Sequence, residues 1–124
     1  MSKGRVLVVE DNMDTYEIVS FILEKSGYET FLAANGRDGT NAAIKQIPDL
    51  IIMDISMPGM DGWTAINLIK QDTRTSAIPL IVLSAHALPA DRKRAIGAGA
   101  SDYITKPMDL NDLVKSVDNW IGKR

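Results

Sequence analysis

Short apolar runs recur along the chain, and polar residues follow each of them. Three such runs lie at Val6–Val9, Leu50–Met53 and Leu80–Leu83. Four apolar residues in a row are typical of a strand that is buried on both faces, as in a parallel sheet covered by helices. A shorter run, Tyr103–Ile104, predicts a further strand, and the alternating residues Glu29–Ala33 predict a strand at the edge of the sheet. The pattern therefore predicts five strands.

Between these strands, apolar residues return at helical spacing. The expected helices are Met13–Lys25, Gly36–Gln46, Trp63–Gln71, one from about Pro89 to Gly97 or Gly99, and a last one that follows Asp109 and carries an apolar stripe from Leu110 to Ile121. In the first helix, Ile18, Phe21 and Ile22 share one face. Strand and helix alternate five times, which predicts an α/β three-layer sandwich with right-handed crossovers.

Composition restricts the class of protein. The chain has 124 residues, 45% of them apolar, and a net charge of −2, which favours one domain over residues 1–124 without an output domain. That charge does not favour non-specific binding to nucleic acid or to a membrane surface. Cysteine is absent, so disulfides and cysteine metal sites are excluded. No apolar run is long enough to span a bilayer, and we expect a cytoplasmic location.

The polar residues that follow the strands form the candidate site. Glu10 and Asp11 follow the first strand, Asp54 ends the central one, Ser84 follows the next, and Lys106 follows the last. Parallel strands share one carboxyl edge, where ligand sites form, and neighbouring strands are about 4.8 Å apart. We therefore expect three carboxylates, a hydroxyl and an ammonium to converge in one cleft.

These groups suit a phosphoryl-transfer site. Like charges in one cleft repel, and a divalent cation such as Mg²⁺, which prefers oxygen ligands, relieves the repulsion of Glu10, Asp11 and Asp54. Lys106 and Ser84 offer donors to an oxyanion, and a carboxylate such as Asp54 can attack phosphorus to give an acyl phosphate. The alternative interpretation is a set of solvated acids at strand ends, without a metal.

With these residues in place, the chain resembles the receiver domain of a two-component response regulator, close to the stand-alone chemotaxis type. The resemblance runs from Arg5 to about Ile121. Its markers are Glu10-Asp11, Asp54 within Asp54-Ile55-Ser56-Met57-Pro58-Gly59-Met60-Asp61-Gly62, Ser84-Ala85, Gly97-Ala98-Gly99-Ala100 and Lys106-Pro107. It implies a flavodoxin-like fold with five helices on both faces of a parallel sheet in the order 2-1-3-4-5.

The resemblance also implies a role for each site residue. Asp54 accepts a phosphoryl group from a phosphohistidine on a sensor histidine kinase or a histidine phosphotransfer protein. Asp11, Asp54 and the backbone carbonyl of Ser56 bind Mg²⁺, for which Mn²⁺ can substitute, and Glu10 acts largely through water. Such a protein is a signalling switch that accepts a phosphoryl group and dephosphorylates itself, rather than an enzyme with a separate substrate.

The switch itself involves other residues. By the same resemblance, Ser84 moves toward the phosphoryl group and Tyr103 turns inward behind it. Lys106-Pro107 carries a cis peptide bond that aims the ammonium. The face made by the fourth helix, fifth strand and fifth helix then binds a downstream protein target. The basic run Arg92-Lys93-Arg94 lies on that face, either as solvated charge or as an aid to partner choice.

Ser56 and His86 stand two residues after Asp54 and Ser84. By family analogy they flank the phosphoryl site and control water access, so we hypothesise that they set the lifetime of the phosphorylated form.

Three other functions stay open. An aspartyl-phosphate phosphohydrolase of the haloacid-dehalogenase type carries a second Asp two residues after its nucleophile, but this chain has Ser56 there. A flavodoxin-like protein that binds flavin or nucleotide needs a Gly-rich phosphate loop, whereas Glu10-Asp11-Asn12 is acidic. A receiver-like adaptor that works without phosphorylation is disfavoured only weakly, because the acceptor set is complete.

Overall fold

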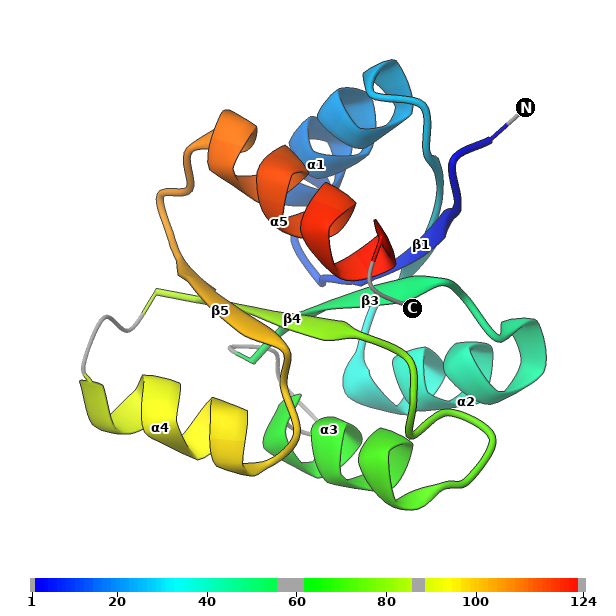
Figure 1. Ribbon diagram of the computed structural model, residues 1–124, viewed down its shortest axis with the longest axis vertical. Helices are drawn as coiled ribbons and strands as arrows, with labels where there is room; N and C mark the ends of the chain where they lie inside the picture. The colour runs from blue at the N-terminus through cyan, green and yellow to red at the C-terminus, as the bar shows by residue number, and fades with distance from the viewer. Residues whose placement is uncertain (1, 56–61, 86–88, 123–124) are drawn as a thin grey trace.

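A computed structural model describes residues 2–55, 62–85 and 89–122 of the chain. Strand and helix alternate throughout these ranges (Figure 1). The elements are β1 (Arg5–Val9), α1 (Met13–Lys25), β2 (Glu29–Ala33), α2 (Gly36–Gln46), β3 (Leu50–Asp54), α3 (Gly62–Gln71), β4 (Leu80–Ser84), α4 (Pro89–Gly97), β5 (Asp102–Thr105) and α5 (Leu110–Gly122). No helix among the described residues is both long enough and apolar enough to cross a membrane.

The five strands form one parallel sheet in the order β2-β1-β3-β4-β5. Helices α1 and α5 cover one face, and α2, α3 and α4 cover the other (Figure 1). The expected α/β fold and strand order are therefore confirmed. The strand order reverses its direction between β1 and β3, which is where open parallel sheets form ligand sites at their carboxyl edge.

Each face of the sheet has its own apolar core. Ile52 packs with the cluster under α1 and α5, which contains Leu113 and Val117 of α5. Its neighbours Ile51 and Met53 pack with the cluster on the opposite face, under α2, α3 and α4. All three strand residues are fully buried. Successive strand side chains point to opposite faces, so two cores require an apolar residue at every position, and this explains the uninterrupted runs.

Capping side chains fix where several helices begin. Asn12 accepts the Thr15 N–H at 3.1 Å, and Asn35 accepts the Asp38 N–H at 2.8 Å. Asp109 accepts the Asn111 N–H at 2.8 Å at the start of α5. These contacts satisfy backbone donors that the first helical turn leaves without a partner.

Glycine sets the position of α3 against the sheet. The helix begins at Gly62, one residue before the predicted start. A Cβ at Gly62 would lie 2.5 Å from the Cα of Ile55, so only glycine permits this approach to the chain just after β3. The contact holds the N-terminus of α3 close to the end of the strand that carries Asp54.

Of the three apolar residues singled out on α1 from the sequence, only Ile22 packs against the core. Ile18 is 52% exposed and Phe21 65% exposed, whereas Val19 and Leu23 are fully buried. The helix therefore has apolar residues on its outer side as well, and periodicity alone does not tell which stripe another element covers.

Candidate functional site

The candidate site lies where the strands end at the carboxyl edge of the sheet. Asp54 is the last residue of β3 and Ser84 the last of β4, while Glu10 directly follows β1 and Lys106 directly follows β5. The register pairs Asp54 with Leu83, so Ser84 is one residue further along the neighbouring strand. Glu10, Asp54 and Ser84 are all buried, with at most 3% of each residue exposed.

Lys106 links two of the acids. Its Nζ lies 2.8 Å from Asp54 Oδ2 and 3.2 Å from Glu10 Oε1, and donates a hydrogen bond to each. The other oxygen of Glu10 accepts the Asn12 N–H at 3.3 Å. The backbone N–H of Lys106 donates to the carbonyl of Ser84 at 2.7 Å, and its peptide bond to the following proline is cis. The two side-chain hydrogen bonds hold the ammonium between the acids.

Glu10, Asp11 and Asp54 form a group that can hold a metal ion. One carboxylate oxygen from each residue lies within 4.8 Å of the others. Asp11 is exposed, whereas its two partners are buried, so a cation held here would keep access to water. An all-oxygen set of this kind suits a hard divalent cation, which commonly retains water and phosphate ligands. The convergence of the three acids and the ammonium agrees with the expectation from strand order.

The electrostatics show the cost of this crowding. The pKa of Glu10 is raised to about 7, first by burial and then by the hydrogen bond and charge of Asp54, while Lys106 opposes the shift. Burial lowers the pKa of Lys106, but its hydrogen bond to Asp54 and the charges of both acids outweigh burial, so the net shift is upward. The ammonium therefore stays charged, while Glu10 holds a proton more readily than an ordinary carboxyl group does.

Other residues from the sequence prediction are placed as follows. Tyr103 lies in β5 and is only 6% exposed. Ser56 and His86 lie outside the described residues, and their expected roles stay predictions. The sequence prediction places Lys106 and Glu10 in one cleft but does not specify a direct hydrogen bond between them. The strand order contained the signal for it, because a residue just after an edge strand can reach across the end of its neighbours.

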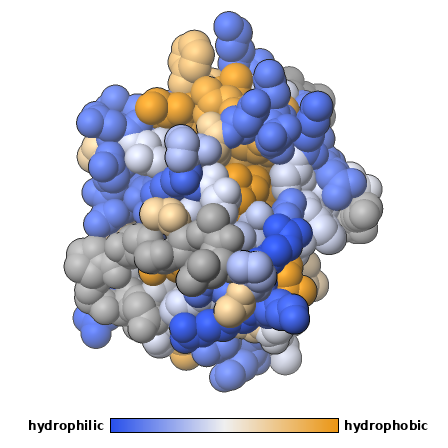
Figure 2. Space-filling view, turned by 90° about the vertical axis from the view of Figure 1, so that its left-hand side faces the viewer, coloured by the Kyte–Doolittle hydropathy of each residue, from blue (hydrophilic) through white to orange (hydrophobic). Residues whose placement is uncertain are grey.

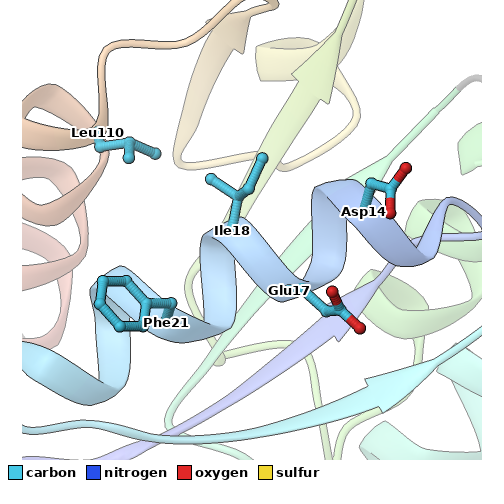
Figure 3. Close-up of a pocket in the computed structure, with 5 residues that line it drawn as sticks. All are labelled: Asp14, Glu17, Ile18, Phe21 and Leu110. Atoms are coloured by element: carbon cyan, nitrogen blue, oxygen red, sulfur yellow. The ribbon is translucent and has the colours of Figure 1, made fainter.

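An apolar surface adjoins the site. Figure 2 looks onto the carboxyl edge and shows apolar side chains gathered at the level of α1 and the start of α5. A groove here is lined by Ile18, Phe21 and Leu110, with Asp14 and Glu17 beside them on α1 (Figure 3). We call this the α1 groove. A second hollow shares Ile18 and Leu110 and is also lined by Thr15, Lys106, Pro107 and Met108, so this surface continues to the lysine of the site.

Fold and site together define a receiver domain. Residues 6–118 match the family model described as the response regulator receiver domain, and the chain belongs to this family. Among curated proteins, it is 37% identical over 115 residues to a protein named PilH from Pseudomonas aeruginosa, covering 93% of this chain and 95% of PilH. It is also 37% identical to the phosphate regulon transcriptional regulatory protein PhoB of Escherichia coli, covering 91% of this chain but only 49% of PhoB.

A solved structure with the same fold is described with a bound metal ion. It is the receiver domain of the sensor histidine kinase PA1611 from Pseudomonas aeruginosa PAO1, described with a magnesium ion coordinated in the active site cleft. The match has a TM-score of 0.88 and 34% identity and covers 96% of this chain and 98% of that one. Membership of the family makes this chain a two-component signalling protein.

Proposed function

We propose that this protein is a phosphorylation-controlled signalling switch that accepts a phosphoryl group on Asp54. The observation that carries the proposal is the position of Asp54: it is buried at a strand end, 2.8 Å from the Lys106 ammonium and grouped with two further acids. Among the acids of this group, Asp54 ends the central strand β3, which lies between β1 and β4. We infer that Lys106 and Ser84 are its catalytic partners.

The transfer needs positioning and charge neutralisation more than covalent help. An oxygen of the Asp54 carboxylate attacks phosphorus while the bond from phosphorus to the donor histidine nitrogen breaks, and the imidazole leaves with the bonding electron pair. The products are an acyl phosphate on Asp54 and a histidine free of phosphate. Lys106 holds a phosphoryl oxygen in place of the carboxylate oxygen that it now binds, and Ser84 offers a further donor.

We further propose Mg²⁺, with Mn²⁺ as a substitute, as the cation of the acid group. Asp11, Asp54 and the Ser56 carbonyl would bind it, with Glu10 acting through water, and its positive charge would stabilise the phosphoryl oxygens. The oxygen-only donors and the exposed side of Asp11 support this assignment. The magnesium ion described in the receiver domain of PA1611 supports it as well.

For the phosphodonor, we propose a sensor histidine kinase or a histidine phosphotransfer protein that docks on the α1 groove. The groove continues to Lys106, so a partner seated there is next to Asp54. Its described lining is apolar except for the acids Asp14 and Glu17, which favours a partner helix with an apolar stripe flanked by basic residues (Figure 3). We also propose that the chain acts as a single-domain regulator, which the match over 95% of PilH supports, and that it works in the cytoplasm.

The phosphoacceptor is tested by mass. Wild type, Asp54→Asn and Asp118→Asn are incubated with acetyl phosphate and Mg²⁺, and each intact mass is measured. We expect one phosphoryl group on wild type and on Asp118→Asn, labile to hydroxylamine and suppressed by EDTA, and none on Asp54→Asn. Equal labelling of Asp54→Asn would exclude Asp54 as the acceptor.

Docking on the α1 groove is tested with two phosphodonors, the small molecule acetyl phosphate and a phosphorylated sensor kinase. Phe21→Asp and the control Leu68→Asp each place a charge at an exposed apolar residue, on α1 and on α3. We expect both to accept phosphate from acetyl phosphate at the wild-type rate. Only Phe21→Asp should lose transfer from autophosphorylated sensor kinases of the same organism. Loss of transfer in both variants, or in neither, would contradict docking on the α1 groove.

The lifetime of the phosphorylated form is a separate proposal. We infer that Ser56 and His86 control water access to the acyl phosphate, and that Tyr103 and Ser84 carry the switch to a downstream protein target. Exchanging Ser56 or His86 should change the rate at which the labelled protein loses its phosphoryl group, measured by intact mass against time. An unchanged rate in both variants would contradict this role.

A further inference from the structure

The carboxylate of Asp102 contacts three elements, β5, α4 and α5, at the edge strand of the sheet. Asp102, the first residue of β5, accepts the Ser116 hydroxyl of α5 at 2.6 Å through Oδ2. Its Oδ1 accepts the Tyr103 backbone N–H at 2.8 Å and lies 3.8 Å from Nη2 of Arg92 in α4. Helices α4 and α5 lie on opposite faces of the sheet (Figure 1). One side chain therefore contacts both helices beside the edge strand.

Arg92 completes the arrangement. Its Nη1 donates to the backbone carbonyl of Tyr103 at 3.2 Å, so the same guanidinium reaches both the Asp102 side chain and the strand backbone. The backbone groups on the outer side of an edge strand are otherwise left to water or to another chain. Here Asp102 binds the N–H of Tyr103 and Arg92 binds its C=O.

These polar contacts add to a small apolar attachment of α4. Of the nine residues of α4, Ala95 alone is buried, whereas α5 buries Leu113 and Val117. A second arginine, Arg94, stacks on the ring of Trp63 in α3 at 4.1 Å from the centroid. Arg94 thus holds α4 to its neighbour on the same face, whereas Arg92 holds it to β5. The basic run predicted from the sequence therefore contributes two arginines to packing.

We propose that Asp102 is a latch that couples α4 to α5 through the backbone of Tyr103. A movement of this strand pulls on both helices, because the carboxylate binds α5 directly and α4 through Arg92. The inference rests on the proposed function for its purpose: Tyr103 belongs to the expected switch, and the latch makes α4 and α5 respond as one surface. Asp102 is a positioning residue, and it touches neither Asp54 nor Lys106 in the contacts found among the described residues.

The test uses amide hydrogen exchange, read by mass spectrometry, on the full chain without a phosphodonor. The variants are Asp102→Ala, Ser116→Ala and Arg92→Gln, with Arg94→Gln as the matched control on α4. We expect Asp102→Ala to speed exchange in both α4 and α5 by roughly five- to tenfold and to leave α1 and α2 unchanged, which shows that the variant is folded. Arg94→Gln should speed exchange in α4 alone.

Coupling is the decisive readout. Ser116→Ala removes a hydroxyl from α5, yet the latch predicts faster exchange in α4 as well. Adding Ser116→Ala to Asp102→Ala should then change nothing further, because both substitutions break the same connection. The latch would be overturned if Ser116→Ala speeds exchange in α5 alone, or if the effects of the two substitutions add in the double variant. Asp102 would then be a local contact.

A second arm separates this inference from the proposed function. Asp102→Ala should take up phosphate from acetyl phosphate and Mg²⁺ at the wild-type rate, because it leaves the acid group intact. Phosphorylation should alter exchange of α4 and α5 together in wild type and separately in the variant. If wild type takes no phosphate, the proposed function fails, and the exchange measured without a phosphodonor still decides the latch. If wild type is labelled but the variants exchange as wild type does, the latch alone fails.

Discussion

Lysine meets carboxylate at both ends of the sheet, with opposite consequences. At the carboxyl edge, the side chains of Lys106, Glu10 and Asp54 are 24%, 1% and 3% exposed. At the amino edge, the pair Lys3 and Asp118 is joined at 3.0 Å with 51% and 45% of the side chains exposed. The first cluster has more negative than positive charge and little water, whereas the second is balanced and well solvated.

The amino-edge pair is built to fasten the chain. The Tyr28 hydroxyl donates to Asp118, and the Lys3 ammonium lies 4.8 Å from the centre of the Tyr28 ring. The Tyr28 hydrogen bond and then the Lys3 contact outweigh burial and lower the pKa of Asp118. Burial, and then Asp118, raise the pKa of Tyr28. Each group thus favours the charge state that it has at neutral pH.

The comparison shows that one type of contact can serve stability or chemistry, depending on burial and charge balance. At the amino edge, the charges stabilise one another and tie the start of the chain to α5. At the carboxyl edge, the raised pKa of Glu10 shows that its charged form is unfavourable there. Active sites commonly keep such strain because an incoming ligand relieves it.

The largest difference between the two ends should come from removing each lysine. Lys106→Met leaves buried carboxylates without their cation, so we expect the free energy of unfolding to fall by about 3 kcal/mol. Lys3→Met removes a solvated partner and should cost less than about 1 kcal/mol. Urea denaturation of both variants in EDTA measures the two losses. Equal losses would show that the two clusters do not differ as described.

The pH dependence of stability should reveal the unfavourable charge of Glu10 at the carboxyl edge of the sheet. The pKa of Glu10 rises from 4.5 to about 7 on folding, so the folded state binds the extra proton. Its favourable contribution is complete below pH 4.5 and is lost as pH rises through 7, by up to about 3 kcal/mol in total. Urea midpoints measured from pH 4.5 to 8 in EDTA should show this loss.

Two controls assign this slope to Glu10 and to the acid group. Glu10→Gln should flatten it, because the amide does not titrate. Millimolar Mg²⁺ should raise stability most at the higher pH, since the cation and the proton on Glu10 relieve the same repulsion between the acids. A slope that survives in Glu10→Gln would contradict the assignment.

A smaller loss of stability is expected at the amino edge, where the charges of Lys3 and Asp118 are balanced. Tyr28→Phe deletes the hydroxyl that donates to Asp118 and should lower the free energy of unfolding by roughly 1 kcal/mol. Asp118 has a lowered pKa, so its contribution is present at neutral pH and is lost as pH falls through its folded-state pKa. Thermal unfolding at several pH values checks both points. Tyr16→Phe, in the same apolar cluster, is the control for losing a hydroxyl.

The smallest effect is a gain, also at the amino edge. Ile47 ends α2 with φ 44° and ψ 67°, a left-handed conformation that disfavours a β-branched side chain. The residue is 47% exposed, so exchanging it loses little burial. We expect Ile47→Asn to raise the free energy of unfolding by about 0.5–1 kcal/mol and Ile47→Val to leave it nearly unchanged. Denaturation midpoints that fall in Ile47→Asn would show that the side chain contributes more than its backbone costs.

Sequence was a good guide where burial alone decides structure. The strands at Leu50–Asp54 and Leu80–Ser84 match their apolar runs because they are covered on both faces. Strand β5 extends beyond its apolar pair to Asp102 and Thr105, since an edge strand is only half covered and tolerates polar residues. The acids at the strand ends were foreseeable because the direction of parallel strands brings their ends together.

Contacts between distant segments away from the strand ends were not foreseeable. Nothing near Arg92 in the sequence indicates that it reaches the Tyr103 carbonyl, and Gly62 appears as a loop residue until its approach to Ile55 is seen. The exposed Phe21 is a similar case, because its spacing fits a buried stripe equally well. Such features depend on which surfaces the fold brings together, and local patterns do not record that.

The two tryptophans give this molecule built-in optical probes. Trp63 packs against the core under α2, α3 and α4 and carries the Arg94 guanidinium over its ring, while Trp120 packs against the opposite core from α5. Indole emission responds to a nearby charge, so the fluorescence of a Trp120→Phe variant would respond when Arg94 of α4 moves relative to Trp63 of α3. A Trp63→Phe variant would report on α5 from the other side of the sheet, and the two faces could be followed in solution without an added dye.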